Sequence, residues 1–230
     1  MSEELESAQP EPRWGPKRVL AGLGALLLLV LLEAGIVAAF DPDFESLAAR
    51  LGIQAMLAAT LVGVAFAFAA PGSGLASAQA LGLRRPPGPF LKATGIAYLA
   101  YFICALVIAA TLQPEQEDVT RDLGFGEGAL GSIAAGLLIV GAAPIAEEVF
   151  FRGFMFAGIR QGARFALAAA GSAVVWGIFH YTGPGSWGVV LQLAVFGVAL
   201  AWLYERTGSL WPPIAVHTLN NALAFAILTS

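Results

Sequence analysis

The sequence predicts an all-α fold, a polytopic transmembrane helical bundle of about seven spans. Of its 230 residues, 58% are hydrophobic and only 12% are charged, and the mean hydropathy is +0.76. A soluble domain carries about 25% charged residues, so this composition excludes a soluble globular enzyme and a disordered chain. No run alternates apolar with polar residues as a barrel strand does, which leaves helices as the spanning elements.

The predicted spans are apolar runs close to the roughly 20 residues that a helix needs to cross a bilayer. They cover residues 19–40, 51–70, 90–112, 129–158, 164–181, 186–204 and 211–228. The fourth run is too long for one simple span and contains Pro144, so we expect a helix that is kinked or loosened there.

The orientation is predicted from the lysine and arginine bias of the connecting segments. With a cytoplasmic N-terminus, the inner segments hold Arg13, Lys17, Arg18, Arg84, Arg85, Lys92, Arg160, Arg164 and Arg206. The outer segments hold only Arg50 and Arg121, and Arg152 lies within a span. Arginine outnumbers lysine ten to two, as in GC-rich bacterial genomes, so the expected location is a bacterial inner membrane. The net charge of −4 gives no basic patch for a nucleic acid partner.

A few ionisable side chains lie inside the predicted spans, where each costs about 2.5–3.5 kcal/mol at the helix centre. They are Glu33, Glu147, Glu148, Arg152, His180 and His217, and they include both histidines of the chain. Asn220 and Asn221 accompany them. This concentration of costly groups indicates a functional site.

The two adjacent glutamates of the fourth run have different predicted roles. Glu148 and Arg152 are four residues apart, so they share a helix face and can pair. Glu147 points about 100° away toward a different neighbour. One carboxylate is then structural and the other free for chemistry. The alternative is an ion pair that only stabilises the helix, with a second carboxylate that reaches toward the membrane surface.

The histidines each have a polar or turn-forming neighbourhood. His217 and Asn221 lie four residues apart on one face of the last run, and such a donor pair can receive an oxyanion. The alternative is polar contact between helices. His180 precedes the turn Gly183-Pro184-Gly185. The alternative to a functional role is a histidine that lies at the membrane interface.

Three motifs in order resemble the CPBP family of intramembrane proteases, which includes type II CAAX prenyl endopeptidases and bacteriocin-processing or immunity proteins. The family pattern is EExxxR, then an aromatic residue with xxxH, then HxxxN. This chain has Glu147-Glu148 with Arg152, then Trp176 with His180, then the His217 motif. Trp176 stands where phenylalanine is more usual. The resemblance covers about residues 125–228.

The resemblance implies an intramembrane endopeptidase with a four-helix catalytic core from the C-terminal half. Glu147 and His180 would activate a water, His217 and Asn221 would stabilise the oxyanion, and the ion pair would brace the site. The substrate would be a membrane-bound or lipid-modified protein or peptide, as in CAAX-type, C-terminal or leader processing. The implied division is a disordered cytoplasmic tail (1–18), N-terminal transmembrane helices (19–124) and a catalytic transmembrane domain (125–228).

Other functions and a metal remain open from the sequence. Glu147, His180 and His217 could form a His₂Glu zinc set, although no HExxH motif occurs. Because Asn221 is a poor zinc ligand and a good oxyanion donor, catalysis by glutamate without a cofactor is preferred. The alternatives are a non-catalytic immunity or scaffold protein of the same fold, or a proton-coupled transporter that uses Glu33, Glu147 and His180 as a relay.

Overall fold

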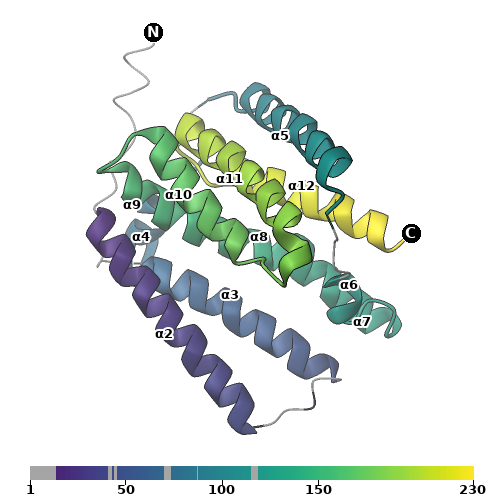
Figure 1. Ribbon diagram of the computed structural model, residues 1–230. Helices are drawn as coiled ribbons and strands as arrows, with labels where there is room; N and C mark the ends of the chain where they lie inside the picture. The colour runs from purple at the N-terminus through teal and green to yellow at the C-terminus, as the bar shows by residue number, and fades with distance from the viewer. Residues whose placement is uncertain (1–13, 41–42, 44–45, 70–73, 87, 115–118) are drawn as a thin grey trace.

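The computed structural model describes residues 14–40, 43, 46–69, 74–86, 88–114 and 119–230. Every regular element in these ranges is helical, which confirms the all-α bundle (Figure 1). The long helices are α2 (Pro16–Phe40), α3 (Leu47–Ala69), α5 (Leu91–Leu112), α11 (Trp187–Thr207) and α12 (Trp211–Leu228). The shorter elements are α4 (Gly74–Ala80), α6 (Val119–Asp122), α10 (Phe165–Ile178) and the 3₁₀ turn η3 (Pro184–Ser186).

The fourth predicted run is one continuous helical stretch in which the backbone adopts a π-helical register twice. It consists of α7 (Gly128–Gly136), η1 (Leu137–Ala142), α8 (Ala143–Glu148), η2 (Val149–Phe156) and α9 (Ala157–Arg160). The segments η1 and η2 are π-helical, with the wider turn that is frequent at functional sites. The prediction that this run loosens at Pro144 is confirmed, because the wider π-helical segment η1 ends at Ala142, two residues before the proline.

Within the described ranges, five helical stretches are long and apolar enough to cross a membrane. The other two predicted spans correspond to α10, which has only 14 residues, and α12, which has 18. Both carry motif residues: α10 ends just before His180, and polar groups from His217 to Asn221 lower the apolar character of α12. The segments that carry the motif residues are therefore also the ones that are harder to recognise as membrane spans.

The helices form two connected groups (Figure 1). The pair α2 and α3 lies along one side, and α3 packs against α8 and η2. On the other side α10 packs most extensively against α11, which in turn contacts α5 and α12. Because α12 also contacts η1 and α8, the three motif-bearing segments α8, α10 and α12 meet in the middle of the bundle.

Small residues bring α10 and α11 into backbone contact. A Cβ atom added at Gly197 would lie 2.7 Å from the Cβ of Ala173, and one added at Gly177 would lie 2.7 Å from the carbonyl oxygen of Val190. Small residues at these positions let the two helices approach closely. A Cβ at Gly171 would make only ordinary contacts.

The N-terminal end of the described chain is part of the packed structure. Trp14 is 3% exposed, its ring stacks on Phe154, and its indole Nε1 donates a hydrogen bond of 2.9 Å to the carbonyl oxygen of Phe154. Helix α2 already begins at Pro16, whose fixed φ suits the first turn of a helix. The predicted tail of residues 1–18 is therefore wrong for residues 14–18, and residues 1–13 lie outside the described ranges.

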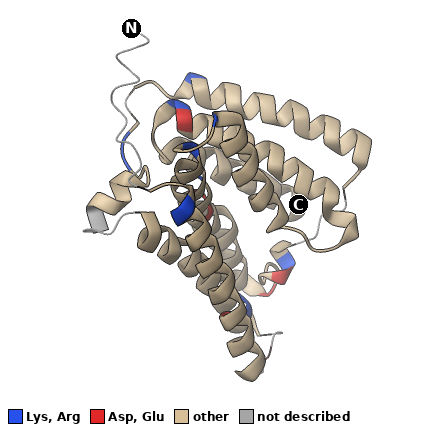
Figure 2. Cartoon of the chain, turned by 60° about the vertical axis from the view of Figure 1, so that its left-hand side comes forward, with Lys and Arg blue, Asp and Glu red and all other residues tan. Residues whose placement is uncertain are grey.

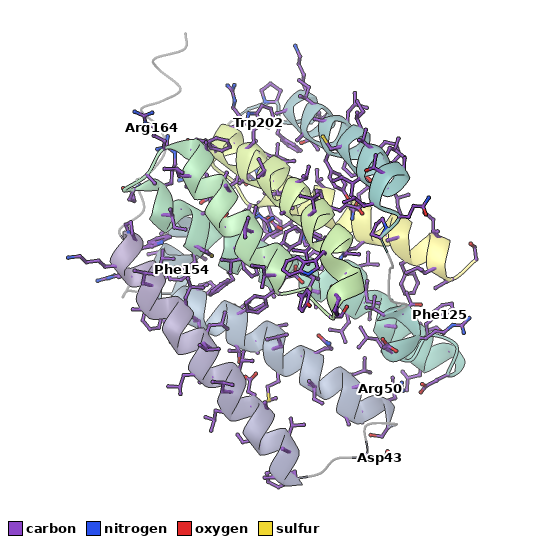
Figure 3. All side chains as sticks on the ribbon, viewed as in Figure 1. Asp43, Arg50, Phe125, Phe154, Arg164 and Trp202 are labelled. Carbon is purple, nitrogen blue, oxygen red and sulfur yellow. The ribbon has the colours of Figure 1, made fainter. Side chains whose placement is uncertain are left out.

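Most charged residues lie toward two opposite ends of the bundle, while its middle carries few (Figure 2). Arg164 and Trp202 lie at one end, here named the Arg164 end (Figure 3). Asp43, Arg50 and Phe125 lie toward the opposite one, here named the Arg50 end. The helix order places the start of α2 and the end of α11 at the Arg164 end, and the end of α12 at the Arg50 end.

Candidate active site

A cavity of about 1150 Å³ opens among α3, α8, α10, α11 and α12. Its lining includes all four residues predicted to be catalytic, Glu147, His180, His217 and Asn221. These side chains come from three segments that lie at least 33 positions apart in the sequence, and the fold brings them to one cavity.

Glu147 lies in the last turn of α8, where the carboxylate reaches toward α10. The indole Nε1 of Trp176 donates a hydrogen bond of 2.5 Å to its Oε2 atom. Its neighbour Glu148 turns to a different part of the bundle, as the helical spacing predicts. One oxygen of Glu147 is thereby held in place, and Oε1 remains for a molecule in the cavity.

His180 lies just beyond the end of α10, in the turn that leads to η3. Its Nδ1 atom is 2.9 Å from the carbonyl oxygen of Trp176. Because a carbonyl oxygen only accepts hydrogen bonds, Nδ1 carries the proton in this contact. In the neutral ring Nε2 is then the acceptor, and it can hold a hydrogen of water.

Glu148 is the centre of a buried ionic cluster. Its Oε1 atom accepts a hydrogen bond of 2.7 Å from Nη1 of Arg152, which confirms the predicted pair, and lies 2.9 Å from Nδ1 of His217. All three side chains are at most 4% exposed. The contact between Glu148 and His217 joins α8 to α12, and no spacing in the sequence could have revealed it.

This cluster specifies what His217 can do. Since Nδ1 donates to a carboxylate, Nε2 is the free ring nitrogen. In the neutral ring Nε2 accepts, and only the imidazolium donates there. The predicted oxyanion role therefore requires the imidazolium form of His217.

Trp176 lies at the centre of the site and is fully buried. Its ring stands edge-on to His180 at 5.4 Å and to His217 at 5.2 Å between ring centroids. The guanidinium carbon of Arg152 lies 4.4 Å from the ring centroid, a cation–π geometry. The sequence marked this residue only as a departure from phenylalanine, and the indole N–H is the group that phenylalanine lacks.

Asn221 is held by a carbonyl group that Pro144 leaves free. Its Nδ2 donates a hydrogen bond of 2.9 Å to the carbonyl oxygen of Ile139, within η1. In this π-helical register the carbonyl of Leu138 accepts from the N–H of Ala143. The next carbonyl, that of Ile139, would need the N–H of residue 144, which proline lacks. Asn221 satisfies this carbonyl and keeps a second amide hydrogen.

Residues from the N-terminal half also line the cavity, and sequence reasoning missed them. Arg50 and Gln54 lie four positions apart on α3, with Ile53 between them. Arg50 forms an ion pair of 2.5 Å with Glu127, just before α7. Because no motif covers these positions, only their shared helix face could have suggested them. The division at residue 125 stays a prediction, and the cavity wall draws on both sides of it.

Glu33 lies apart from this cavity. The hydroxyl of Thr60 donates a hydrogen bond to its Oε1 atom, which joins α2 to α3. The cavity lining includes Glu147 and His180 but not Glu33. A proton relay through these three groups therefore has no support from this arrangement.

The possible zinc ligands Glu147, His180 and His217 all line the cavity. Among the described residues, no three histidine, cysteine, aspartate or glutamate side chains gather closely enough to hold a metal ion. The Nδ1 atom of each histidine has a protein partner, which leaves Nε2 as the free ring nitrogen, as it also is in histidines that bind metals.

The comparisons with known proteins locate the same segment. Residues 129–223 match the family model described as type II CAAX prenyl endopeptidase Rce1-like. The match covers less than half of the chain. The family segment contains all three motifs, from Glu147 to Asn221, and the resemblance to the CPBP proteases is confirmed. With its apolar helices, the chain is an integral membrane protein.

A relative in Bacillus subtilis (strain 168) bears the name Putative membrane peptidase YdiL. It is 35% identical to this chain over 78 residues, which are 34% of this chain and 30% of the relative. The aligned part thus spans less than a third of the relative's length. No solved structure matches the chain.

Proposed function

We propose that this protein is an intramembrane endopeptidase that hydrolyses a peptide bond of a membrane-associated protein or peptide. The observation that carries the proposal is the convergence of Glu147, His180, His217 and Asn221 on one cavity inside an apolar bundle. The match of residues 129–223 to the Rce1-like family model and the peptidase name of the relative support it.

The proposed reaction begins with a water held between Oε1 of Glu147 and Nε2 of His180. Glu147 takes a proton from this water as its oxygen attacks the carbonyl carbon of the peptide, so that a C–O bond forms. The charge moves to the carbonyl oxygen. The free amide hydrogen of Asn221 and the Nε2 proton of imidazolium His217 stabilise that oxyanion.

The intermediate then collapses, the C–N bond breaks, and the proton held by Glu147 passes to the departing amine. Glu148 and Arg152 take no part in bond making. Their proposed role is to orient His217 from below the cavity, where Oε1 of Glu148 contacts both basic groups. No cofactor is needed for this sequence of steps.

The proposed setting is a bacterial inner membrane with the N-terminus in the cytoplasm. The lysine and arginine residues toward the Arg164 end support this orientation. The partners are then the lipid bilayer and a membrane-bound or lipid-modified substrate, with no nucleic acid.

The test compares wild-type protein with Glu147→Gln, which keeps the size of the side chain and removes its basicity. Glu33→Gln is the matched control, because Glu33 is another carboxylate between membrane helices but lies outside the cavity lining. Peptide termini in membrane fractions are quantified by mass spectrometry in cells that lack the protein or make each version at equal levels. We expect new termini with wild type and Glu33→Gln and none with Glu147→Gln. Unchanged cleavage by Glu147→Gln would end the proposal.

A further inference from the structure

We propose that the substrate segment reaches Glu147 from the Arg50 end of the bundle, and that this end faces the outside of the cell. The inference rests on the proposed function and adds a substrate class to it. The substrates are exported or membrane-embedded polypeptides that present an apolar segment at the outer face.

The cavity extends from the site to the Arg50 end along α12. After His217, its lining continues through Asn221, Ala224, Phe225 and Leu228, the last residue of the helix. These 11 positions cover about 16 Å at about 1.5 Å per residue. The cavity thus follows α12 from the site to the end of the helix.

The residues around the outer part of the cavity belong to the same end. Arg50 lies in the first turn of α3, and its ion pair with Glu127 connects α3 to the start of α7. Asp122 ends the short helix α6. All three line the cavity. Figure 3 shows Arg50 far from Arg164.

Toward the Arg164 end the interior is closed by large apolar side chains. On η2 these are Phe150 and Phe154, and on α11 they are Phe196, Leu200 and Leu203, all fully buried. The last three lie progressively closer to the end of α11. A peptide therefore has no path to Glu147 from that side within the described structure.

The distribution of basic residues assigns the two ends to the two sides of the membrane. In the described ranges the Arg164 end carries eight of them, Lys17, Arg18, Arg84, Arg85, Lys92, Arg160, Arg164 and Arg206. The Arg50 end carries only Arg50 and Arg121. Such a bias places the Arg164 end in the cytoplasm.

Contacts between distant segments show that several of these basic residues lie at the same end of the bundle. Arg160 pairs with Glu205 at 2.9 Å, and Nε of Arg84 donates to the carbonyl oxygen of Gly208 at 2.7 Å. The loop after α4, the end of α9 and the end of α11 therefore share the Arg164 end. The sign of the bias does not depend on any single residue.

The cavity wall indicates the chemistry of the segment that enters. Ile53, Leu123, Leu193, Ala224 and Phe225 make much of its surface apolar. The reactive groups lie at its inner end. A lipid-modified C-terminus on the cytoplasmic side would face the closed side of the bundle, whereas an apolar stretch presented from outside can reach the site.

The experiment measures which side of the membrane gives access to the cavity. The chain's single cysteine is removed by Cys104→Ala, and Ala224→Cys or Arg85→Cys is added. Ala224 lines the cavity, whereas Arg85 is exposed toward the Arg164 end. A charged, membrane-impermeant maleimide is applied to spheroplasts and, separately, to inverted membrane vesicles.

We expect Ala224→Cys to react in spheroplasts and not in inverted vesicles, and Arg85→Cys to behave in the opposite way. Reaction of Ala224→Cys only in inverted vesicles, or on neither side, would overturn the inference. If Ala224→Cys fails to accumulate, Leu228→Cys at the end of α12 gives the same readout. Labelling needs no cleavage, so loss of the protease assignment in the Glu147→Gln test is a separate result.

Discussion

The indole N–H of Trp176 donates a 2.5 Å hydrogen bond to the carboxylate of Glu147 and links α10 to α8. The same indole ring separates the two histidines and lies against the guanidinium group of Arg152. Phenylalanine could fill this space, but it could not hold the carboxylate. Trp176 is therefore a positioning residue for the proposed general base.

Trp176→Phe should lower kcat about 10- to 100-fold with little change in KM. A hydrogen bond to a charged group contributes about 1.5–3 kcal/mol, and the ring that contacts the histidines is kept. Trp211→Phe, at the half-exposed start of α12, is the control. The measurement uses a peptide substrate found from the membrane termini, and an increase in KM alone would argue against the positioning role.

Asn221→Ala should reduce the cleavage rate about 10²–10³-fold, as for other oxyanion donors, while the protein still accumulates in the membrane. Its neighbour Asn220 is the matched control, because it lies on the same helix but outside the cavity lining. Single-turnover rates of the two alanine variants are compared. Equal rates for both would remove Asn221 from the oxyanion site.

Pro144→Ala should impair activity about tenfold without lowering stability. The new N–H at residue 144 can bond to the carbonyl of Ile139 and compete with Asn221 for it. The double variant Pro144→Ala with Asn221→Ala should be no slower than Asn221→Ala alone, since both changes act through one group. Additive losses in this cycle would mean that the proline acts elsewhere.

Arg152→Met should destabilise the protein by about 3–5 kcal/mol, because it leaves the buried carboxylate of Glu148 without its arginine partner. Arg50→Gln removes a partly exposed pair with Glu127 and should cost at most about 1 kcal/mol. Thermal unfolding of both variants in detergent gives the comparison. If Arg152→Met matches wild type in stability, the buried pair is not a structural brace.

Chelation should leave cleavage unchanged, because the proposed steps use only side chains of the chain. Purified protein is analysed for bound metal, and activity is measured before and after treatment with a zinc chelator. Stoichiometric zinc together with chelator-sensitive activity would replace the glutamate mechanism by a metal-dependent one.

The helical spacing of the sequence was sufficient to predict the contacts within one helix. Glu148 and Arg152 pair at four residues' separation, and Glu147 turns to another neighbour. The shared helix face of His217 and Asn221 was predicted in the same way. In the structure both residues line one cavity. These relations follow from the 3.6 residues per turn of an α-helix, so the spacing of the residues in the sequence is enough to predict them.

Contacts between segments distant in the sequence could not be predicted in this way. The bond between Glu148 and His217 spans 69 positions, and its existence depends on how α12 packs on α8. The π-helical register of η1 and the bond from Asn221 to Ile139 also depend on packing, although Pro144 was a visible sign of irregular backbone. The residues of α3 that line the cavity belong to no recognisable motif, so the sequence did not indicate their role.

The docking of Trp14 on Phe154 has a practical consequence for shortened versions of this protein. Phe154 belongs to η2, the stretch that follows Glu147 and Glu148 directly. Deletion beyond residue 13 would uncover a buried phenyl ring and leave a backbone acceptor without its indole donor. Tags or fusions should therefore be joined ahead of this tryptophan, so that the helix with both glutamates keeps its support.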